Sequence, residues 1–277
     1  TGHGAAGALL PLLAERLGVS LDGRNLETNG RFAPNPEPNA ETLPPFLDTV
    51  KADVAFAAMI DPDGDRLAIG IPGTAIASEE WTLPLVAAAR LAGSPAGQVL
   101  ITNLSTSSRL ESVAARHDAE VLRTPVGEAH VVGAMRQHRA ALGGEGNGGV
   151  IDPQVHLGRD AAVAFARLCE VEATVPGGLK ETAAAFPPRV MRKEKFELGA
   201  AGEPGAAGLQ RYEAALTAVF GEPQDRRDGL RWSFEDGFVH LRCSNTEPVI
   251  RGVIERGSAE RVSDGAAALR KVFREVH

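Results

Sequence analysis

Strand-like and helix-like segments alternate through the middle of the chain, and this alternation limits the possible folds more than any other feature. Residues 97–104 ("GQVLITNL") and 119–124 ("AEVLRT") have the short apolar pattern of buried strands. Amphipathic stretches at 105–118 and 126–138 follow them and predict helices. This β-α-β-α order is typical of an α/β domain.

The length of 277 residues indicates more than one domain, because a single core stops growing at about 250–300 residues. "PGG" at 176–178 and "FPPR" at 186–189 interrupt the pattern. Beyond them we predict a hairpin that turns at Asp236-Gly237 and a closing amphipathic helix. The predicted fold is therefore two α/β domains with mixed sheets, followed by a smaller α+β C-terminal domain. Their predicted ranges are 1–78, 79–185 and 186–277.

Composition argues against several kinds of partner. The net charge of −7 is unlike that of a broad nucleic-acid-binding surface. No apolar run approaches the roughly 20 residues that a membrane helix needs, and the first residues lack the pattern of a signal peptide. Cys169 and Cys243 lie far apart and fit a reducing compartment. We therefore expect a cytoplasmic protein with no nucleic-acid or membrane partner.

The segment "MIDPDGDRLAIG" at 59–70 places Asp61, Asp63 and Asp65 at alternate positions after an apolar strand. Alternate residues of an extended chain point to the same side, so the three carboxylates would converge and repel one another. A hard divalent cation removes that repulsion, and oxygen ligands favour Mg²⁺, Mn²⁺ or Ca²⁺ over zinc. The alternative is a solvated acidic turn. An EF-hand does not fit, because glycine is the fourth residue of the loop and Pro72 the twelfth.

The glycine-rich segment "GGEGNGG" at 143–149 contains one acid, Glu145, and one amide, Asn147. Glycine allows the backbone to approach a ligand closely, and a carboxylate can accept two hydroxyl hydrogen bonds. Both features suit recognition of a sugar. Taken alone, the segment is more typical of a plain flexible loop.

The segment "RCSNTEPVIR" at 242–251 has arginines at both ends and a serine, an asparagine and a threonine between them. Arginine forms forked, charge-assisted hydrogen bonds with phosphate, and hydroxyl, amide and loop N–H groups can complete an anion site. A polar turn between two strands, with two unrelated arginines, fits the segment equally well.

Taken together, these three segments resemble the α-D-phosphohexomutase superfamily, which contains the phosphomannomutases and phosphoglucomutases. "DPDGDR" is similar to its magnesium loop, "GEGNGG" to its sugar-recognition loop, and "RCSNTEPVIR" to its phosphate-binding loop. "TPVGEAHV" at 124–131 also resembles the stretch ahead of the sugar loop, and all four occur in family order.

The resemblance implies an isomerase of carbohydrate metabolism that moves a phosphoryl group between C1 and C6 of a hexose phosphate through a bisphosphate intermediate. In this reaction a phosphoserine donates one phosphoryl group and takes back the other, and Mg²⁺ stabilises the moving charge. The resemblance also implies a role for each matching residue. Asp61, Asp63 and Asp65 would bind the metal, and Arg66 would lie beside the transferred phosphoryl group. Glu145 and Asn147 would bind the sugar, and the phosphate that does not react would be anchored by Arg242, Ser244, Asn245, Thr246 and Arg251.

The chain departs from the family pattern in two ways. Asn147 stands where the sugar loop usually has serine, so a different hydroxyl preference is expected. The chain also lacks a stretch like T-A-S-H-N-P, which carries the family's catalytic serine. "LSTSSR" at 104–109 is rich in serine, but it matches a later segment of the family and predicts the start of a helix. We therefore expect the family's first domain to be missing or supplied as a separate N-terminal phosphoserine domain, and this chain alone to be inactive.

Two other functions fit part of the sequence. Loss of catalysis would leave a non-catalytic sugar-phosphate-binding or interaction protein derived from the family. An aspartate-nucleophile phosphatase using Asp61 or Asp63 would need a downstream lysine. Lys180 is the first lysine after the loop and lies near a predicted linker, which disfavours the phosphatase.

Overall fold

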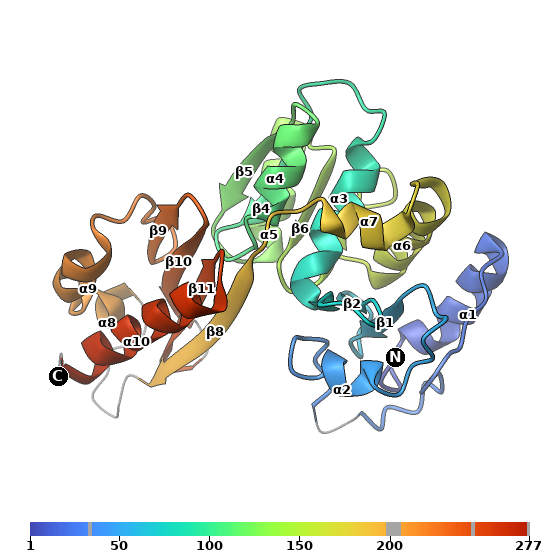
Figure 1. The fold of residues 1–277 in the computed structure, drawn as a ribbon, viewed down its shortest axis with the longest axis horizontal. Helices are drawn as coiled ribbons and strands as arrows, with labels where there is room; N and C mark the ends of the chain where they lie inside the picture. The colour runs from blue at the N-terminus through green and yellow to red at the C-terminus, as the bar shows by residue number, and fades with distance from the viewer. Residues whose placement is uncertain (33–34, 198–205, 245–246, 276–277) are drawn as a thin grey trace. The chain divides into compact units, whose positions relative to one another are not determined.

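A computed structural model describes residues 1–32, 35–197, 206–244 and 247–275 of the chain (Figure 1). Contacts divide the chain into two compact units. The N-terminal unit contains Thr1–Thr106 and Leu110–Phe186, and the C-terminal unit contains Ser107–Arg109 and Pro187–His277. The boundary predicted after residue 78 falls inside the N-terminal unit, and the division into three domains stays a prediction.

The N-terminal unit contains two sheets. The first has the order β1-β2-β3, and its strands are antiparallel. The second has the order β5-β4-β6-β7, with parallel pairing except at β7. The elements of this unit are α1 (Ala6–Leu17), α2 (Leu43–Leu47), β1 (Ala57–Ile60), β2 (Leu67–Gly70), β3 (Ala77–Ser78), η1 (Glu79–Trp81), α3 (Thr82–Leu91), β4 (Val99–Asn103), α4 (Arg109–Arg116), β5 (Glu120–Thr124), α5 (Glu128–His138), β6 (Leu142–Glu145), β7 (Gly149–Ile151), α6 (Ala161–Thr174) and α7 (Gly178–Ala184).

Both faces of the second sheet are buried, as expected for parallel strands joined by helices. Successive residues of β4 point to opposite faces, so Leu100 and Ile101 belong to different hydrophobic clusters. Leu100 packs in the large core that includes Leu85 of α3 and Leu168 of α6, whereas Ile101 packs with residues of α5. The large core also contains residues of β2, so it joins the two sheets of this unit.

Helix α6 begins at a strong N-terminal cap. Asp160 has extended backbone angles, and its carboxylate accepts hydrogen bonds from the N–H groups of Ala162, at 2.7 Å, and Val163, at 3.0 Å. Such a cap stabilises a helix by about 1 kcal/mol. The N–H of Ala161 also donates to the carbonyl of Gly64 at 3.0 Å. The start of α6 is therefore fixed against the aspartate loop.

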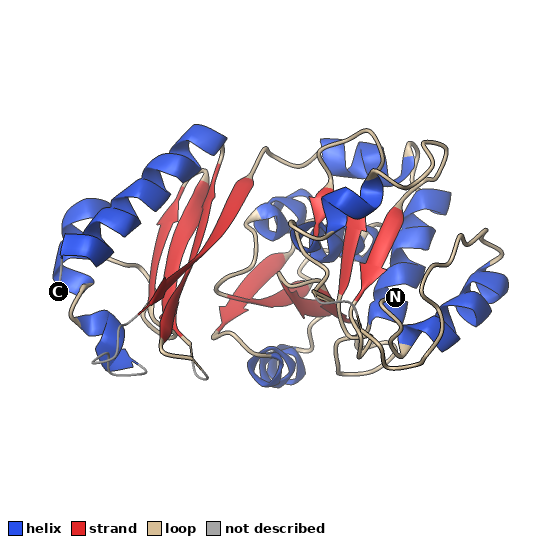
Figure 2. Cartoon of the chain, turned by 90° about the horizontal axis from the view of Figure 1, so that it is seen from below, coloured by secondary structure: helices blue, strands red, loops and turns tan. Residues whose placement is uncertain are grey.

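The C-terminal unit is one antiparallel sheet of order β8-β11-β10-β9, with helices packed on one face (Figure 2). Its buried core includes Trp232, Leu241, Ile254 and Leu269. Its elements are β8 (Val190–Glu197), α8 (Ala206–Gln210), α9 (Glu213–Phe220), β9 (Leu230–Phe234), β10 (Gly237–Cys243), β11 (Val249–Arg256) and α10 (Ala259–Glu275). Together with the mixed sheet of the N-terminal unit, this architecture confirms the predicted fold class.

A buried carboxylate explains why residues 107–109 group with the C-terminal unit. Glu255 of β11 is fully buried and accepts hydrogen bonds from the N–H of Ser108, at 2.8 Å, and from the hydroxyls of Ser107 and Ser108. Arg189 Nε donates to the Ser108 hydroxyl oxygen at 2.9 Å. The charge of Glu255 is thus compensated by several donors, as a buried charge requires.

The structure shifts one local prediction for the C-terminal unit. The β9–β10 hairpin turns at Glu235-Asp236, one residue earlier than expected, because the pairing puts Phe234 opposite Gly237. The Asp236 carboxylate accepts from Arg256 Nε, at 2.8 Å, and from the N–H of Gly257, at 3.0 Å. These contacts come from residues distant in sequence and hold the turn in place.

His240 makes the stability of the C-terminal unit sensitive to acid. Its side chain is buried in β10, with Nε2 at 2.7 Å from the carbonyl oxygen of Asp228. Burial lowers the pKa of His240 to about 4, from its usual value near 6.5. The folded state therefore favours the neutral ring. Its stabilising contribution is present above pH 6.5 and is lost as the pH falls from 6.5 toward 4.

We expect the C-terminal unit to lose about 2 kcal/mol of stability between pH 7 and pH 5 because of this shift. In His240→Asn, which does not ionise, this part of the pH dependence should disappear. Hydrogen exchange of the amides of β10 and β11, corrected for the intrinsic rate at each pH, measures the effect. The same loss in both proteins would contradict the assignment to His240.

Candidate active site

The aspartate loop joins β1 to β2, which pair directly at Ile60 and Leu67. Asp61 is fully buried, and its Oδ1 accepts hydrogen bonds at 3.1 Å from the N–H groups of Gly64, Asp65 and Arg66. Gly64 has a φ of +80°, a conformation that favours glycine. One carboxylate oxygen therefore shapes the whole loop.

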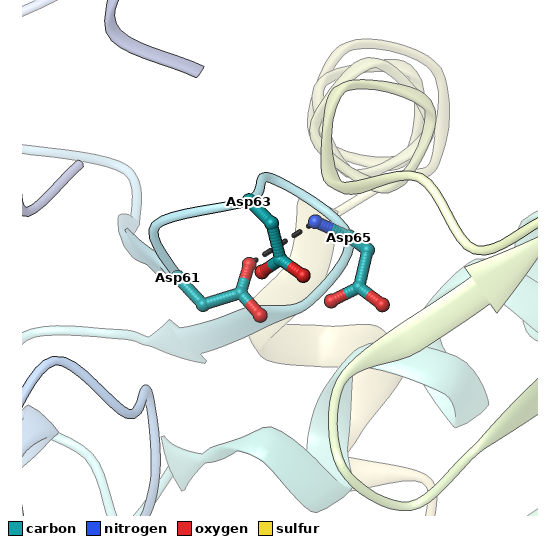
Figure 3. Close-up of side chains that lie close together, drawn as sticks. All are labelled: Asp61, Asp63 and Asp65. Carbon is teal, nitrogen blue, oxygen red and sulfur yellow. Dashed lines mark hydrogen bonds between the residues drawn. The ribbon is translucent and has the colours of Figure 1, made fainter. Parts of the chain in front are cut away.

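The three predicted metal ligands lie together. One carboxylate oxygen from each of Asp61, Asp63 and Asp65 can be chosen so that all lie within 4.8 Å of one another (Figure 3). Burial and the neighbouring Asp65 carboxylate raise the pKa of Asp61 to about 7. The cluster offers only oxygen donors, and three negative charges there would repel one another, so its chemistry fits a hard divalent cation.

Arg66 is held by three acids, Asp61, Asp65 and Glu37. Its Nε lies 2.7 Å from Asp61 Oδ2, and both terminal nitrogens contact Glu37, one of them at 3.1 Å. Burial by itself would lower the pKa of Arg66, but the hydrogen bond to Glu37 and the charge of Asp61 raise it on balance. No sequence pattern pointed to Glu37, which lies in the proline-rich segment before α2.

The glycine-rich segment is a tight hairpin of β6 and β7, and not the flexible loop that its composition suggested. It lies directly against β2. Leu67 N–H donates to the carbonyl of Gly148 at 3.1 Å, and a Cβ on Gly148 would lie 2.3 Å from the Leu67 carbonyl oxygen. The hairpin and the aspartate loop therefore meet at one place in the N-terminal unit.

Glu145 is buried and held from several sides. Its Oε1 accepts from Asn103 Nδ2, at 2.8 Å, and from the N–H of Gly127, at 2.9 Å, and its Oε2 accepts from Arg159 Nη1, also at 2.9 Å. Asn147 Nδ2 lies 3.5 Å from Glu145 Oε2. Donors from three other segments thus fix the orientation of this carboxylate.

Arg159 is the residue of this site that sequence analysis missed most clearly. Its Nη2 lies 2.5 Å from Asp65 Oδ2, while its Nη1 binds Glu145. One guanidinium therefore links the aspartate loop to the glycine hairpin. The only signal in the sequence was an arginine directly before the helix-capping Asp160, and nothing local indicated its partners.

The predicted phosphate anchor lies at the end of β10, in the following turn and at the start of β11 in the C-terminal unit. Arg242 and Arg251 are direct partners across β10 and β11, so their side chains leave the same face of the sheet. Arg251 Nη2 contacts Glu247 at 2.8 Å, and its buried Nε has no hydrogen-bond partner among the described residues. Ser244 is buried. The other two predicted anchor residues, Asn245 and Thr246, lie outside the described residues.

Comparisons with known proteins cover almost the whole chain. Three domain models of the phosphoglucomutase/phosphomannomutase family match: alpha/beta/alpha domain II at residues 1–73, alpha/beta/alpha domain III at 80–190 and the C-terminal domain at 189–272. A phosphoglucomutase/phosphomannomutase of Thermococcus kodakarensis is 35% identical over 266 residues, which are 95% of this chain and 57% of the relative. A probable phosphoglucosamine mutase of Methanopyrus kandleri is 30% identical over 264 residues, 95% of this chain and 58% of the relative.

Solved structures agree with these matches. A phosphoglucomutase/phosphomannomutase family protein of Burkholderia thailandensis is 27% identical, with a TM-score of 0.82, and the match covers 100% of this chain and 59% of that one. A putative phosphomannomutase of Thermus thermophilus, 23% identical, has the same fold, with a TM-score of 0.75 over 99% of this chain and 60% of that one. The chain thus spans less than two thirds of the length of these proteins. Within the described residues, no helix is long and apolar enough to cross a membrane. The chain belongs to the phosphoglucomutase/phosphomannomutase family and contains its domains II, III and IV.

Proposed function

We propose that this chain provides the metal-, sugar- and phosphate-binding parts of a phosphohexomutase, which moves a phosphoryl group between C1 and C6 of a hexose phosphate. One observation carries the proposal: Arg159 binds both Asp65 and Glu145, so the acidic cluster and the sugar-loop carboxylate belong to one network. The names of the relatives from Thermococcus and Methanopyrus support the same reaction class.

In the proposed reaction, Asp61, Asp63 and Asp65 hold Mg²⁺, which when bound offsets negative charge on the transferred phosphoryl group. Arg66 lies one residue from this cluster and donates to the same group. Its ion pair with Glu37 keeps the guanidinium at the loop. Because Glu37 and a phosphoryl group are both negatively charged, the phosphoryl group can replace Glu37 as the partner of Arg66.

The sugar and its second phosphate are bound by the remaining predicted residues. Glu145 accepts hydrogen bonds from sugar hydroxyls beside Asn147, and its fixed orientation suits recognition of a defined pair of hydroxyls. Arg242, Ser244, Asn245, Thr246 and Arg251 anchor the phosphate that does not react. The unpartnered Nε of Arg251 is a donor suited to a phosphate oxygen. The phosphoserine comes from outside these 277 residues, in the same or a separate polypeptide, because the chain has no stretch like T-A-S-H-N-P.

The proposal is tested by titrating glucose 1-phosphate and glucose 6-phosphate into the chain by calorimetry. We expect Glu145→Gln to weaken binding by about 10-fold or more, because hydrogen bonds to a charged acceptor are worth about 1.5–3 kcal/mol. Glu170→Gln is the control, since Glu170 lies half exposed on α6 and pairs with Arg167. Absence of hexose phosphate binding by the unaltered chain would contradict the proposed function.

The same samples test where the phosphoserine lies. ³¹P NMR should detect no interconversion of the two hexose phosphates by the pure chain. Turnover by the chain alone would show that its own residues supply the phosphoryl donor.

A further inference from the structure

We propose that Arg159 is a positioning residue that couples occupancy of the carboxylate cluster to the orientation of Glu145. In this role its guanidinium is an internal cation that a bound metal must displace from Asp65. The inference rests on the proposed function, because that function assigns the metal to the cluster and the sugar to Glu145. It adds a link between these two binding events.

The geometry of Arg159 supports this role. Besides Asp65 and Glu145, its Nε lies 3.6 Å from Glu128 Oε2, so three acids surround one guanidinium. Its side chain is 20% exposed. The aliphatic part lies over Gly149, where a Cβ would come within 2.3 Å of Arg159 Cδ. The side chain is therefore confined between the hairpin and the aspartate loop.

The backbone of Arg159 is also fixed. Its N–H donates to Glu128 Oε1 at 2.8 Å, and the following residue, Asp160, caps α6. His156 Nε2 lies 2.9 Å from Asp160 Oδ2. Because the base of the side chain is held, a change of partner by the guanidinium requires only rotation within the side chain.

The charges around Asp65 explain the coupling. Asp65 contacts two guanidiniums, Arg159 at 2.5 Å and Arg66 Nε at 3.3 Å. A divalent cation at the cluster competes for the same carboxylate and repels the nearby Arg159. Arg159 is then left with Glu145 and Glu128. Metal binding therefore strengthens the contact that orients Glu145, and a well-oriented Glu145 favours the metal-bound state in return.

The first test is calorimetric titration of Mg²⁺ alone into the chain. Arg159→Met keeps the aliphatic stem but frees Asp65, so we expect Mg²⁺ to bind about 10-fold more tightly. Arg159→Gln should give the same gain, and Arg159→Lys, which keeps the charge, should stay close to the unaltered chain. Arg167→Met is the matched control, because Arg167 also pairs with two acids, Asp152 and Glu170, away from the cluster. Tighter binding is a gain that structural damage would not produce.

The second test titrates glucose 1-phosphate with and without saturating Mg²⁺. We expect Mg²⁺ to tighten binding by about 5-fold or more in the unaltered chain. This dependence should be smaller in Arg159→Met and Arg159→Gln, which keep only the direct attraction between Mg²⁺ and the phosphate. If the unaltered chain binds both ligands but the Arg159 variants show unchanged or weaker Mg²⁺ binding, the coupling role is wrong and the proposed function stands. If the unaltered chain binds neither ligand, both proposals fail.

Discussion

Asp63→Asn should weaken Mg²⁺ binding by a factor on the order of 100, because one of the three charged ligands in the proposed site is lost. The same change should leave the unfolding temperature almost unaltered. Asp63 is exposed, and its side chain makes no hydrogen bond or ion pair with any other described residue. Calorimetric titration of Mg²⁺, together with thermal unfolding in the absence of metal, measures both effects.

The choice of Asp63 separates metal binding from loop stability. Asp61 accepts three backbone hydrogen bonds and pairs with Arg66, so Asp61→Ala would leave several buried groups unsatisfied and disturb the loop itself. Asp53→Asn is the control, because Asp53 is an exposed aspartate of the same unit. Equal Mg²⁺ affinity in Asp63→Asn and Asp53→Asn would remove the metal assignment.

Gly148→Ala should destabilise the N-terminal unit by about 4 kcal/mol. Gly148 has a φ of +89°, and an added Cβ would lie 2.3 Å from the Leu67 carbonyl oxygen, which is backbone and cannot rotate away. The substitution therefore combines a strained conformation with a clash at the contact between the hairpin and β2. Urea unfolding followed by circular dichroism measures the loss.

Gly133→Ala should have the opposite effect and stabilise the same unit. Gly133 lies inside α5, and a Cβ there would meet nothing within 4 Å. Alanine should stabilise the helix by up to about 1 kcal/mol. Equal free energies of unfolding for Gly148→Ala and Gly133→Ala would contradict the close contact between the hairpin and Leu67.

The aspartate cluster could be predicted from the sequence because its determinants are local. The three carboxylates lie within five residues, in a loop between two short strands that pair with each other. They must therefore lie close together in almost any conformation of the loop. The strands and helices of the second sheet were predicted for the same reason, since their apolar periodicity is a property of each segment.

The glycine hairpin shows where composition misleads. Glycines at 143–149 were typical of a flexible loop, yet the segment is paired strand on both sides of a short turn. The glycines are needed because other parts of the chain approach them. Met135 packs over Gly143, and Arg159 over Gly149. A sequence pattern cannot distinguish a glycine that gives flexibility from one that gives room to a neighbour.

The sequence by itself determined which side chains the candidate site offers: three carboxylates in one short loop, one acid among glycines, and two arginines at the ends of a polar turn. It also determined the α/β class, because strand and helix periodicity depends on near neighbours. Only the tertiary structure decided which charges meet. The contacts of Arg159 with Asp65, Arg66 with Glu37 and Ser108 with Glu255 join residues far apart in the chain. Their partners are set by how the elements pack, since the ion pair depends on distance in space and not on spacing in sequence.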